Sequence, residues 1–234
     1  MICEHKEGGW TAFCWRCSLD GWVPKPTPSL HERIARLRRV AEVETELVQD
    51  LKAPLPAIYD VQQWPKEPRL WLYKAGMSND AIETNGFYYH ERSERVVMPV
   101  GPSYWQARGF DTTRPKYINP PLNAKPIFKA GDAGPLVITE DILSAIRVGE
   151  VARGWCVTGT STSDDNIREI ASAKCDVFVW LDPDAAGIKG RRKTIPRLRA
   201  YGVNARSIRT PKDPKYYNRQ EIADFIGIDA SKAP

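Results

Sequence analysis

The chain has 234 residues, with 34 lysines and arginines against 29 aspartates and glutamates, so its formal net charge is +5. Hydrophobic residues make up 42% and charged residues 27%, as in ordinary globular domains, which excludes a disordered or collagen-like chain. At about 100–200 residues per domain, the length allows one medium domain with a small appendage. No apolar run approaches the roughly 20 residues of a membrane helix, and the first residues do not resemble a secretory leader. We therefore expect a cytoplasmic protein without a membrane segment.

Three of the five cysteines fall within the first 17 residues. Cys3 and His5 form one short pair, and Cys14 and Cys17 form a second, Cys-x2-Cys pair. Two such pairs are typical of a zinc ribbon, whose turns present thiolate and imidazole groups to one tetrahedral ion. Some 22 residues bury too little apolar surface to fold alone, so a structural zinc would supply the missing stability. We predict that residues 1–22 bind Zn²⁺ through these four ligands, in a closed site that holds shape.

A proline-rich segment follows, with three prolines in residues 23–28. Such a segment forms an extended, semi-rigid spacer. Ser29 can cap a helix that runs to about Lys52. We therefore assign residues 23–52 to a linker and helix, and residues 53–234 to the main domain.

Residues 53–134 are rich in proline and aromatic residues. The pattern predicts a helical pair at residues 68–76 and 78–84, and two strands at residues 95–100 and 104–108. An extended basic and aromatic segment follows at residues 116–120. Cations beside aromatic rings suit phosphate contact and base stacking. A chance surface arrangement explains the same pattern, so both interpretations stay open.

From Gly134 onward, strands and helices alternate regularly. The predicted strands are residues 136–139, 154–157, 176–181 and 203–208, and the predicted helices are residues 141–149, 164–173 and 185–201. Repeats of this length imply a parallel sheet flanked by helices, whose ligands gather at the carboxyl ends of the strands.

Three acidic residues are expected at that edge. Glu140 ends the first of these strands, while Asp182 and Asp184 end the third and, being two apart, are expected to point the same way. Carboxylates gathered there repel one another unless a hard cation such as Mg²⁺ or Mn²⁺ neutralises them, an arrangement that suits phosphoryl chemistry. Alternatively, acidic residues cap the helices that follow. Capping explains one carboxylate at each helix but not the pair.

The charge reverses immediately after this acidic pair. Residues 185–219, which we call the basic strip, contain eleven lysines and arginines and one aspartate. A basic surface beside a metal site favours nucleic acid or a nucleoside triphosphate as ligand. The alternative is a basic helix face that is only solvated.

Several motifs together resemble a known family. Three segments look like the TOPRIM domain: Val137–Glu140, Gly159–Thr160 and Leu181–Gly187. Four more look like the segments that flank TOPRIM in bacterial and phage DNA primases: Arg95–Pro99, Gln106–Arg108, Lys116–Asn119 and Thr210–Pro214. With a zinc ribbon ahead of them, the order of parts is similar to the primase half of phage primase-helicases. The resemblance covers about residues 1–22 and 68–227.

The resemblance implies an α+β fold with an α/β TOPRIM subdomain at about residues 134–210, and synthesis of short RNA primers on single-stranded DNA by magnesium-dependent nucleotidyl transfer. By this resemblance, Asp182 and Asp184 would bind Mg²⁺, and Glu140 would bind metal or act as the base for the attacking 3′-hydroxyl. A role for Asp141 is left open. The residues implied to contact nucleotide, primer, template or phosphate are Arg108, Lys116, Tyr117, Asn119, Lys189, Arg191 and Arg192.

The implied partners are a single-stranded DNA template, ribonucleoside triphosphates and a separate replicative helicase, because no residues remain for a helicase motor. If the chain is phage-encoded, its location is the host cytoplasm. Two rival functions stay open. A recombination mediator would join zinc motif and TOPRIM domain to clamp DNA without catalysis, but its zinc motif usually has four cysteines after a helix-hairpin-helix segment. A TOPRIM nuclease would share the acidic site without needing residues 116–119.

Overall fold

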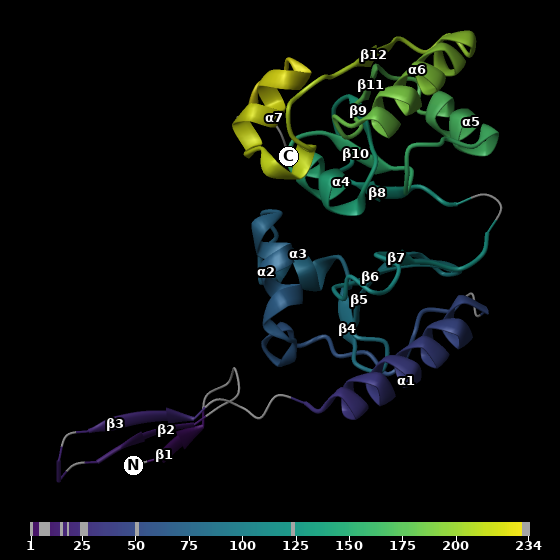
Figure 1. Ribbon diagram of the computed structural model, residues 1–234. Helices are drawn as coiled ribbons and strands as arrows, with labels where there is room; N and C mark the ends of the chain where they lie inside the picture. The colour runs from purple at the N-terminus through teal and green to yellow at the C-terminus, as the bar shows by residue number, and fades with distance from the viewer. Residues whose placement is uncertain are drawn as a thin grey trace. The chain divides into compact units, whose positions relative to one another are not determined.

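The computed structural model describes residues 2–4, 10–14, 16–17, 19–23, 28–49, 52–122 and 125–230, and for residues 2–4, 11, 48 and 49 it describes the backbone alone. The chain divides into two compact units, residues 1–46 and 47–234 (Figure 1). Within the described ranges, no helix combines the length and apolar character needed to cross a membrane.

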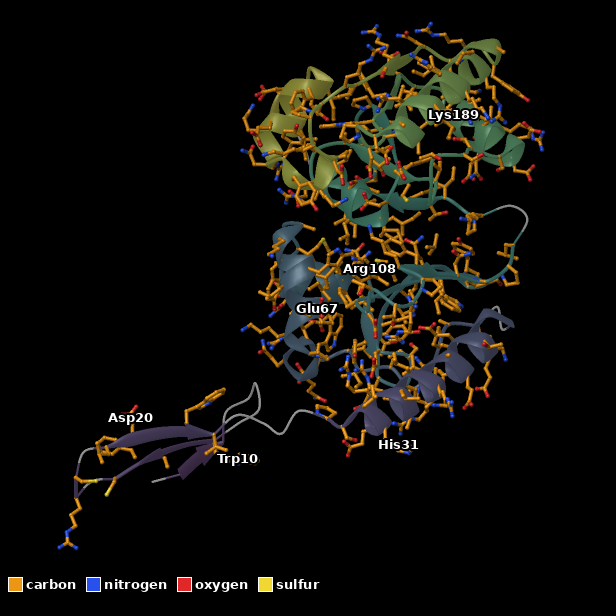
Figure 2. All side chains as sticks on the ribbon, viewed as in Figure 1. Trp10, Asp20, His31, Glu67, Arg108 and Lys189 are labelled. Atoms are coloured by element: carbon orange, nitrogen blue, oxygen red, sulfur yellow. The ribbon has the colours of Figure 1, made fainter. Side chains whose placement is uncertain are left out.

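The first unit begins with a small antiparallel sheet. Its strands β1 (Ile2–Glu4), β2 (Trp10–Phe13) and β3 (Asp20–Val23) pair in that order. The register pairs Trp10 with Val23 and Phe13 with Asp20, so the labelled Trp10 and Asp20 lie at opposite ends of the β2–β3 hairpin (Figure 2). A turn containing Cys14 and Cys17 joins these two strands.

A long helix, α1 (Leu30–Gln49), follows the linker. The backbone amide of Glu32 donates to Ser29 Oγ over 3.2 Å, and the amide of Ser29 donates to Glu32 Oε2 over 2.7 Å. Two reciprocal bonds of this kind form a capping box, which satisfies amides that the first helical turn leaves open. The predicted cap at Ser29 is therefore confirmed, and the helix is described as far as Gln49, where the prediction ran to about Lys52.

The second unit opens with short helices and an antiparallel meander. The helices are η1 (Val61–Gln63), α2 (Lys66–Lys74) and α3 (Asn79–Thr84), and the meander pairs β4 (Tyr88–His90), β5 (Arg95–Gly101), β6 (Tyr104–Gly109) and β7 (Tyr117–Ile118) in chain order. These elements confirm the predicted helical pair and both predicted strands.

The rest of the second unit is a five-stranded sheet with helices on both faces (Figure 1). Its order is β12 (Ala205–Ser207), β11 (Val177–Val179), β9 (Leu136–Thr139), β10 (Arg153–Cys156) and β8 (Phe128–Ala130). All neighbours are parallel except β8, which runs antiparallel to β10. The predicted parallel sheet flanked by helices is confirmed.

The helices cover this sheet in two layers. Side chains of α4 (Ile142–Gly149) and α7 (Arg219–Ile226) pack on one face, and those of α5 (Asp164–Ser172) and α6 (Ala185–Ala200) pack on the other. A short helix, η2 (Pro214–Tyr216), precedes α7. Strand β8 and helix α7 have no counterpart among the predicted elements.

One hydrophobic core joins the meander to the parallel sheet. Phe87 and Met98, no more than 1% exposed, belong to the same buried cluster as Ile142 and Leu143 of α4. Helix α4 lies close against β10 because residue 154 is glycine: a Cβ there would lie 2.0 Å from the carbonyl oxygen of Ala145. This shared core places β6, β7 and α2 opposite the carboxyl ends of the parallel strands.

Candidate active site

The carboxyl ends of β9, β10 and β11 meet at one edge of the parallel sheet. Glu140 directly follows β9, and Asp182 comes three residues after β11. The strand predicted to run to residue 181 ends at Val179. The alternation of a strand therefore does not extend to Asp182 and Asp184, and their spacing does not determine whether their side chains point the same way. Asp184 instead caps α6, with its Oδ1 accepting from the backbone amide of Gly187 over 2.7 Å.

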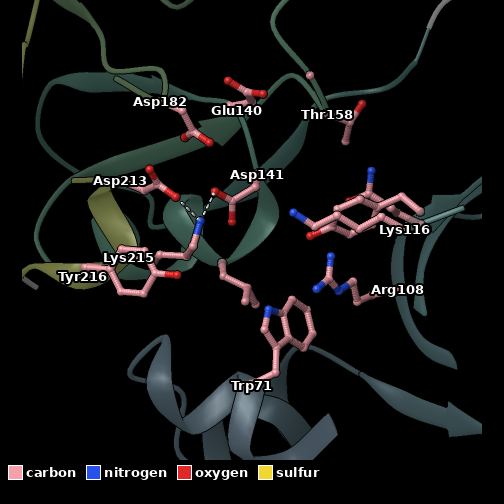
Figure 3. A pocket seen from close by; sticks show the side chains of 14 residues that line it. Trp71, Arg108, Lys116, Glu140, Asp141, Thr158, Asp182, Asp213, Lys215 and Tyr216 are labelled. Atoms are coloured by element: carbon pink, nitrogen blue, oxygen red, sulfur yellow. Dashed lines mark hydrogen bonds and ion pairs between the residues drawn. The ribbon is translucent and has the colours of Figure 1, made fainter. Parts of the chain in front are cut away.

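This edge forms one wall of a pocket of about 390 Å³ (Figure 3). Acidic groups line the wall at the sheet edge, and basic and aromatic groups from α2, β6 and β7 face them across the cavity. The lining residues are Trp71, Gln106, Arg108, Lys116, Tyr117, Glu140, Asp141, Leu143, Thr158, Gly159, Asp182, Asp213, Lys215 and Tyr216.

Four carboxylates form what we call the acidic cluster: Glu140, Asp141, Asp182 and Asp213. Oxygens of the three aspartates lie within 4.8 Å of one another, a grouping that can hold a metal ion. Asp141 also caps α4, since its Oδ1 accepts from the Ser144 amide over 3.1 Å and its Oδ2 from Ser144 Oγ over 2.7 Å. Helix capping at residue 141 is therefore confirmed, and it coexists with membership of the cluster.

Two oxygens of the acidic cluster are buried without a hydrogen-bond partner among the described residues, Glu140 Oε2 and Asp182 Oδ1. Burial, followed by the negative charges of Asp182, Asp184 and Asp141, raises the pKa of Glu140 to about 7. Burial and the charges of Asp213 and Asp141 likewise raise the pKa of Asp182 to about 6. The charge of Lys215 opposes this rise at Asp182 without cancelling it. Buried oxygens that lack a hydrogen-bond donor fit a hard divalent cation, which takes oxygen ligands.

The chain holds Asp182 in place from two directions. Arg191, only 7% exposed, donates from Nη1 to the carbonyl oxygens of Leu181 and Asp182 over 2.7 and 3.2 Å. On the other side residue 187 must be glycine, because a Cβ there would lie 2.2 Å from the Asp182 carbonyl oxygen. The motif from Asp182 to Gly187 is thus a tight turn whose backbone is fixed before any ligand arrives.

The loop that carries Asp213 is held by the residue that directly follows β11. Trp180, fully buried, donates from Nε1 to Thr210 Oγ1 over 2.7 Å, and Thr210 Oγ1 donates to the carbonyl oxygen of Lys212 over 2.8 Å. Lys215 Nζ donates to Asp213 Oδ2 over 2.6 Å and to Asp141 Oδ2 over 3.0 Å. Burial lowers the pKa of Lys215, but the charges of Asp141 and Asp213 outweigh it, so the net shift is upward.

The turn after β10 is strained. Thr158 adopts φ of +51° and Gly159 φ of +141°. A β-branched residue with positive φ is a genuine outlier, and such strain concentrates at functional sites. Both residues line the pocket, and Gly159 donates its amide to the carbonyl oxygen of Glu140 over 3.0 Å. The strained turn therefore fixes the backbone that presents Glu140.

Arg108 of β6 faces the acidic cluster from the opposite wall (Figure 3). Its guanidinium carbon lies 5.5, 5.5 and 5.2 Å from the ring centroids of Trp71, Phe110 and Tyr117. Its Nε and Nη1 are buried, and neither has a hydrogen-bond partner in the described part of the chain. An aromatic box holds the charge by cation–π attraction and leaves donors available to an anion.

The structure brings only some of the predicted binding residues to this pocket. Lys116 and Tyr117 line it, whereas Asn119 does not and donates from Nδ2 to the Pro120 carbonyl oxygen over 3.1 Å. Lys189 lies on α6, in a different part of the unit from Arg108 (Figure 2). Arg192 and Arg191 line a separate hollow, together with Ser207 of β12 and Arg209. The roles of these residues remain predictions.

Part of the basic strip serves the fold. Arg197 donates to the Thr162 carbonyl oxygen and to Asp164 Oδ1, both over 2.5 Å, and Arg199 donates twice to the Ala205 carbonyl oxygen. Arg191 and Lys215 have structural partners as well. The remaining seven cations of the strip are all exposed: Lys189, Arg192, Lys193, Arg206, Arg209, Lys212 and Arg219.

Two of the four predicted zinc ligands come together. Hydrogen bonds from the backbone and side chain of Cys17 lower the pKa of the Cys14 thiol, which suits two thiolate ligands. The backbone of Cys3 in β1 pairs with that of Thr11 in β2. The side chain of Cys3 and the whole of His5 lie outside the described residues. The four-ligand set therefore stays a prediction.

The raised pKa values predict how stability depends on pH without a divalent cation. As pH rises from about 4, the unfolded chain releases the protons of Glu140 and Asp182 before the folded chain does. The folded state therefore loses stability on going to about pH 8, and Glu140→Gln removes part of the loss. We expect urea denaturation across this range to show a shallower decline for Glu140→Gln than for the wild type or for the exposed control Glu91→Gln. Equal slopes for all three would contradict the assignment.

Together the antiparallel meander, the parallel sheet and the acidic edge have the fold of the catalytic core of TOPRIM-type DNA primases. No family model matches the chain. A DNA primase of Halalkalibacterium halodurans is 28% identical over 184 residues, which cover 68% of this chain and 30% of that protein. The chain thus spans less than a third of the length of this relative.

Three solved structures show the same fold. The DnaG primase catalytic domain bound to single-stranded DNA has a TM-score of 0.57 and 18% identity, covering 85% of this chain and 79% of that one. The zinc-binding and RNA polymerase domains of Aquifex aeolicus primase have a TM-score of 0.51 and 21% identity, covering 86% of this chain and 62% of that one. The primase fragment of the bacteriophage T7 primase-helicase protein has a TM-score of 0.50 and 13% identity, covering 97% of this chain and 92% of that one. The predicted resemblance is confirmed at the level of the fold.

Proposed function

We propose that this chain is a DNA primase that synthesises short RNA primers on a single-stranded DNA template by magnesium-dependent nucleotidyl transfer. One observation carries the proposal: buried carboxylate oxygens of Glu140 and Asp182 and two buried nitrogens of Arg108, all without a hydrogen-bond partner among the described residues, line the same pocket. A nucleoside triphosphate with its divalent cation presents both complementary charges. The matches to primase cores support the same function.

On the acidic side, Glu140 and Asp182 would hold Mg²⁺, because each has a buried oxygen without a donor among the described residues. Asp213 lies beside Asp182. Asp184 is the further ligand that the resemblance implies. The bound ion would stabilise charge on the phosphates during in-line displacement at the α-phosphorus. The alternative role of Glu140 is that of the base that accepts the proton of the attacking 3′-hydroxyl.

On the basic side, Arg108 would donate to phosphate oxygens from its fixed aromatic box. Lys116 and Tyr117 border the same pocket and would contact nucleotide, primer or template. Of the exposed cations, Lys189 and Arg192 would neutralise phosphates of nucleic acid outside the pocket. Arg191 would act indirectly, as a positioning residue, because its guanidinium donates to the carbonyl oxygens of Leu181 and Asp182.

The decisive test incubates the zinc-loaded chain with Mg²⁺, labelled ribonucleoside triphosphates and single-stranded DNA of varied sequence. We expect short oligoribonucleotides that require both template and Mg²⁺. DNA cleavage that Glu140→Gln and Asp182→Ala both abolish would favour the nuclease instead. Template binding with neither synthesis nor cleavage would favour the recombination mediator. Absence of template-dependent product across all templates would overturn the primase proposal.

We also propose that residues 1–22 bind a structural Zn²⁺ and contact the template. The lowered pKa of the Cys14 thiol and the zinc-binding domain of the Aquifex aeolicus primase support this assignment. A separate replicative helicase stays a predicted partner.

Removing zinc should unfold residues 1–22 and impair the choice of start site more than nucleotide binding, because a small ribbon depends on its metal for folding. Zinc release measured with a chromogenic chelator, together with primer start sites mapped for Cys14→Ser, checks this prediction. Cys175→Ser, on a cysteine outside the ribbon, is the matched control. Unchanged start sites in Cys14→Ser would contradict it.

A further inference from the structure

Lys215 is the one cation that the structure places inside the acidic cluster, as far as its residues are described. Its Nζ lies 3.0 Å from Asp141 Oδ2 and 2.6 Å from Asp213 Oδ2, and its side chain is only 12% exposed (Figure 3). Both partners are also mostly shielded, at 20% and 21% exposure. The contact is therefore a shielded ion pair network and not a surface pair that water screens.

The oxygens of the acidic cluster fall into two groups by what they contact. Asp141 has both oxygens engaged, one by the Ser144 amide and the other by Ser144 Oγ and Lys215 Nζ. Asp213 Oδ2 also accepts from Lys215. Glu140 Oε2 and Asp182 Oδ1, by contrast, have no donor among the described residues. Within the described residues, one half of the cluster thus contacts the Lys215 ammonium directly, and the other half has oxygens that no donor reaches.

We propose that Lys215 is a fixed cation that occupies the position of a second divalent ion, so that this site takes one divalent cation, between Glu140 and Asp182. Sites with two metals hold the ions about 3.5–4 Å apart between shared carboxylates. Here the aspartate oxygens lie within 4.8 Å of one another, and the ammonium already lies between two of them. Unlike a metal ion, an ammonium cannot coordinate substrate oxygens. Lys215 contributes charge and hydrogen-bond donors, two of which the aspartates already engage.

The chain also fixes Lys215 so that it does not leave the cluster easily. It belongs to η2, and Pro214 before it is buried, while Arg147 of α4 donates from Nη2 to the carbonyl oxygen of Tyr217 over 3.1 Å. The ammonium therefore ties η2 to the cap of α4 while it neutralises the second half of the site. A purely structural tie would link η2 to α4 without taking the place of a second ion. The experiment must separate these two roles.

The experiment titrates Mn²⁺ into the zinc-loaded chain and counts bound ions from the loss of the free-ion signal in electron paramagnetic resonance. The wild type and the charge-conserving Lys215→Arg are expected to bind one Mn²⁺ in the cluster. Lys215→Met, which keeps the length of the side chain but removes its charge, is expected to bind a second ion at least about tenfold more tightly than the wild type does. Thermal unfolding with and without Mn²⁺ accompanies each titration, and Mn²⁺ should raise the melting temperature of Lys215→Met more than that of the wild type.

This inference rests on the metal site of the proposed function, and Asp182→Asn separates the two failures. If Asp182→Asn leaves Mn²⁺ binding unchanged, the metal site itself is wrong. If Asp182→Asn abolishes binding while folded Lys215→Met binds as the wild type does, Lys215 is only a structural tie and the inference is overturned. Two ions bound to the wild-type cluster would also overturn it. Should Lys215→Met not fold even with Mn²⁺, Lys215→Gln replaces it in the same comparison.

Discussion

Replacing Asp182 with asparagine is expected to lower template-dependent primer synthesis about a hundredfold or more. The bound cation supplies several kcal/mol of charge stabilisation to phosphoryl transfer, and each 1.36 kcal/mol is tenfold in rate. Asparagine keeps the shape of the side chain, and the fixed turn around residue 182 still holds the backbone. Because the substitution also removes a buried charge beside Asp141 and Asp213, we expect no loss of stability without metal.

The comparison with Asp184→Asn tests whether this aspartate, which lies outside the acidic cluster, is also a metal ligand. Asparagine caps a helix about as well as aspartate, so Asp184→Asn keeps the hydrogen bond to the Gly187 amide while removing the charge. Because Asp182 lines the pocket and Asp184 does not, we expect Asp184→Asn to lose less primer synthesis than Asp182→Asn. If Asp184 is a metal ligand, the two variants should lose equal activity. Asp132→Asn, on an exposed loop, controls for preparation. Full activity of Asp182→Asn at saturating Mg²⁺ would exclude it as a ligand.

The order of elements in the parallel sheet could be read from the chain because its hydrophobic periodicity is strong. The strand at residues 136–139 matches β9, and the helix starting at Asp164 matches the start of α5. Helix α7 carried a readable signal as well: Asn218 and Glu221 form a capping box, and Gly227 ends the helix with φ of +78°. Strand β8 carried none, since three residues show too little alternation to separate a strand from a loop.

The site was predictable only where a residue adjoins a regular element. Glu140 directly follows β9, so its place at the carboxyl edge follows from the sheet. Gln106 could have been added, because it is two residues before Arg108 on β6 and shares its face. Asp213 and Lys215 reach the cluster through a loop held by Trp180, and Trp71 reaches it from α2 through the shared core. Tertiary contacts of that kind leave no local pattern in the sequence.

Arg108 is the second residue whose loss should be large. Arg108→Met removes charge-assisted hydrogen bonds, each worth about 1.5–3 kcal/mol, so we expect kcat/KM for ribonucleoside triphosphates to fall about 10–100-fold. Most of the change should appear as a higher KM, because the guanidinium faces the pocket before and during reaction. Arg108→Lys should recover only part of it, since an ammonium cannot reproduce the planar fork of donors between three rings.

The control for Arg108 must separate the loss of a cation–π contact from the loss of a phosphate ligand. Lys129 provides it, because its Nζ lies 4.4 Å from the centroid of the Trp155 ring and 2.6 Å from Glu169 Oε1, outside the pocket. Lys129→Met should therefore leave kcat/KM near that of the wild type. Steady-state primer synthesis at varied triphosphate concentration measures both variants. An equal effect of the two substitutions would show that Arg108 acts through stability alone, and the buried donors of β6 would then have no part in binding the triphosphate.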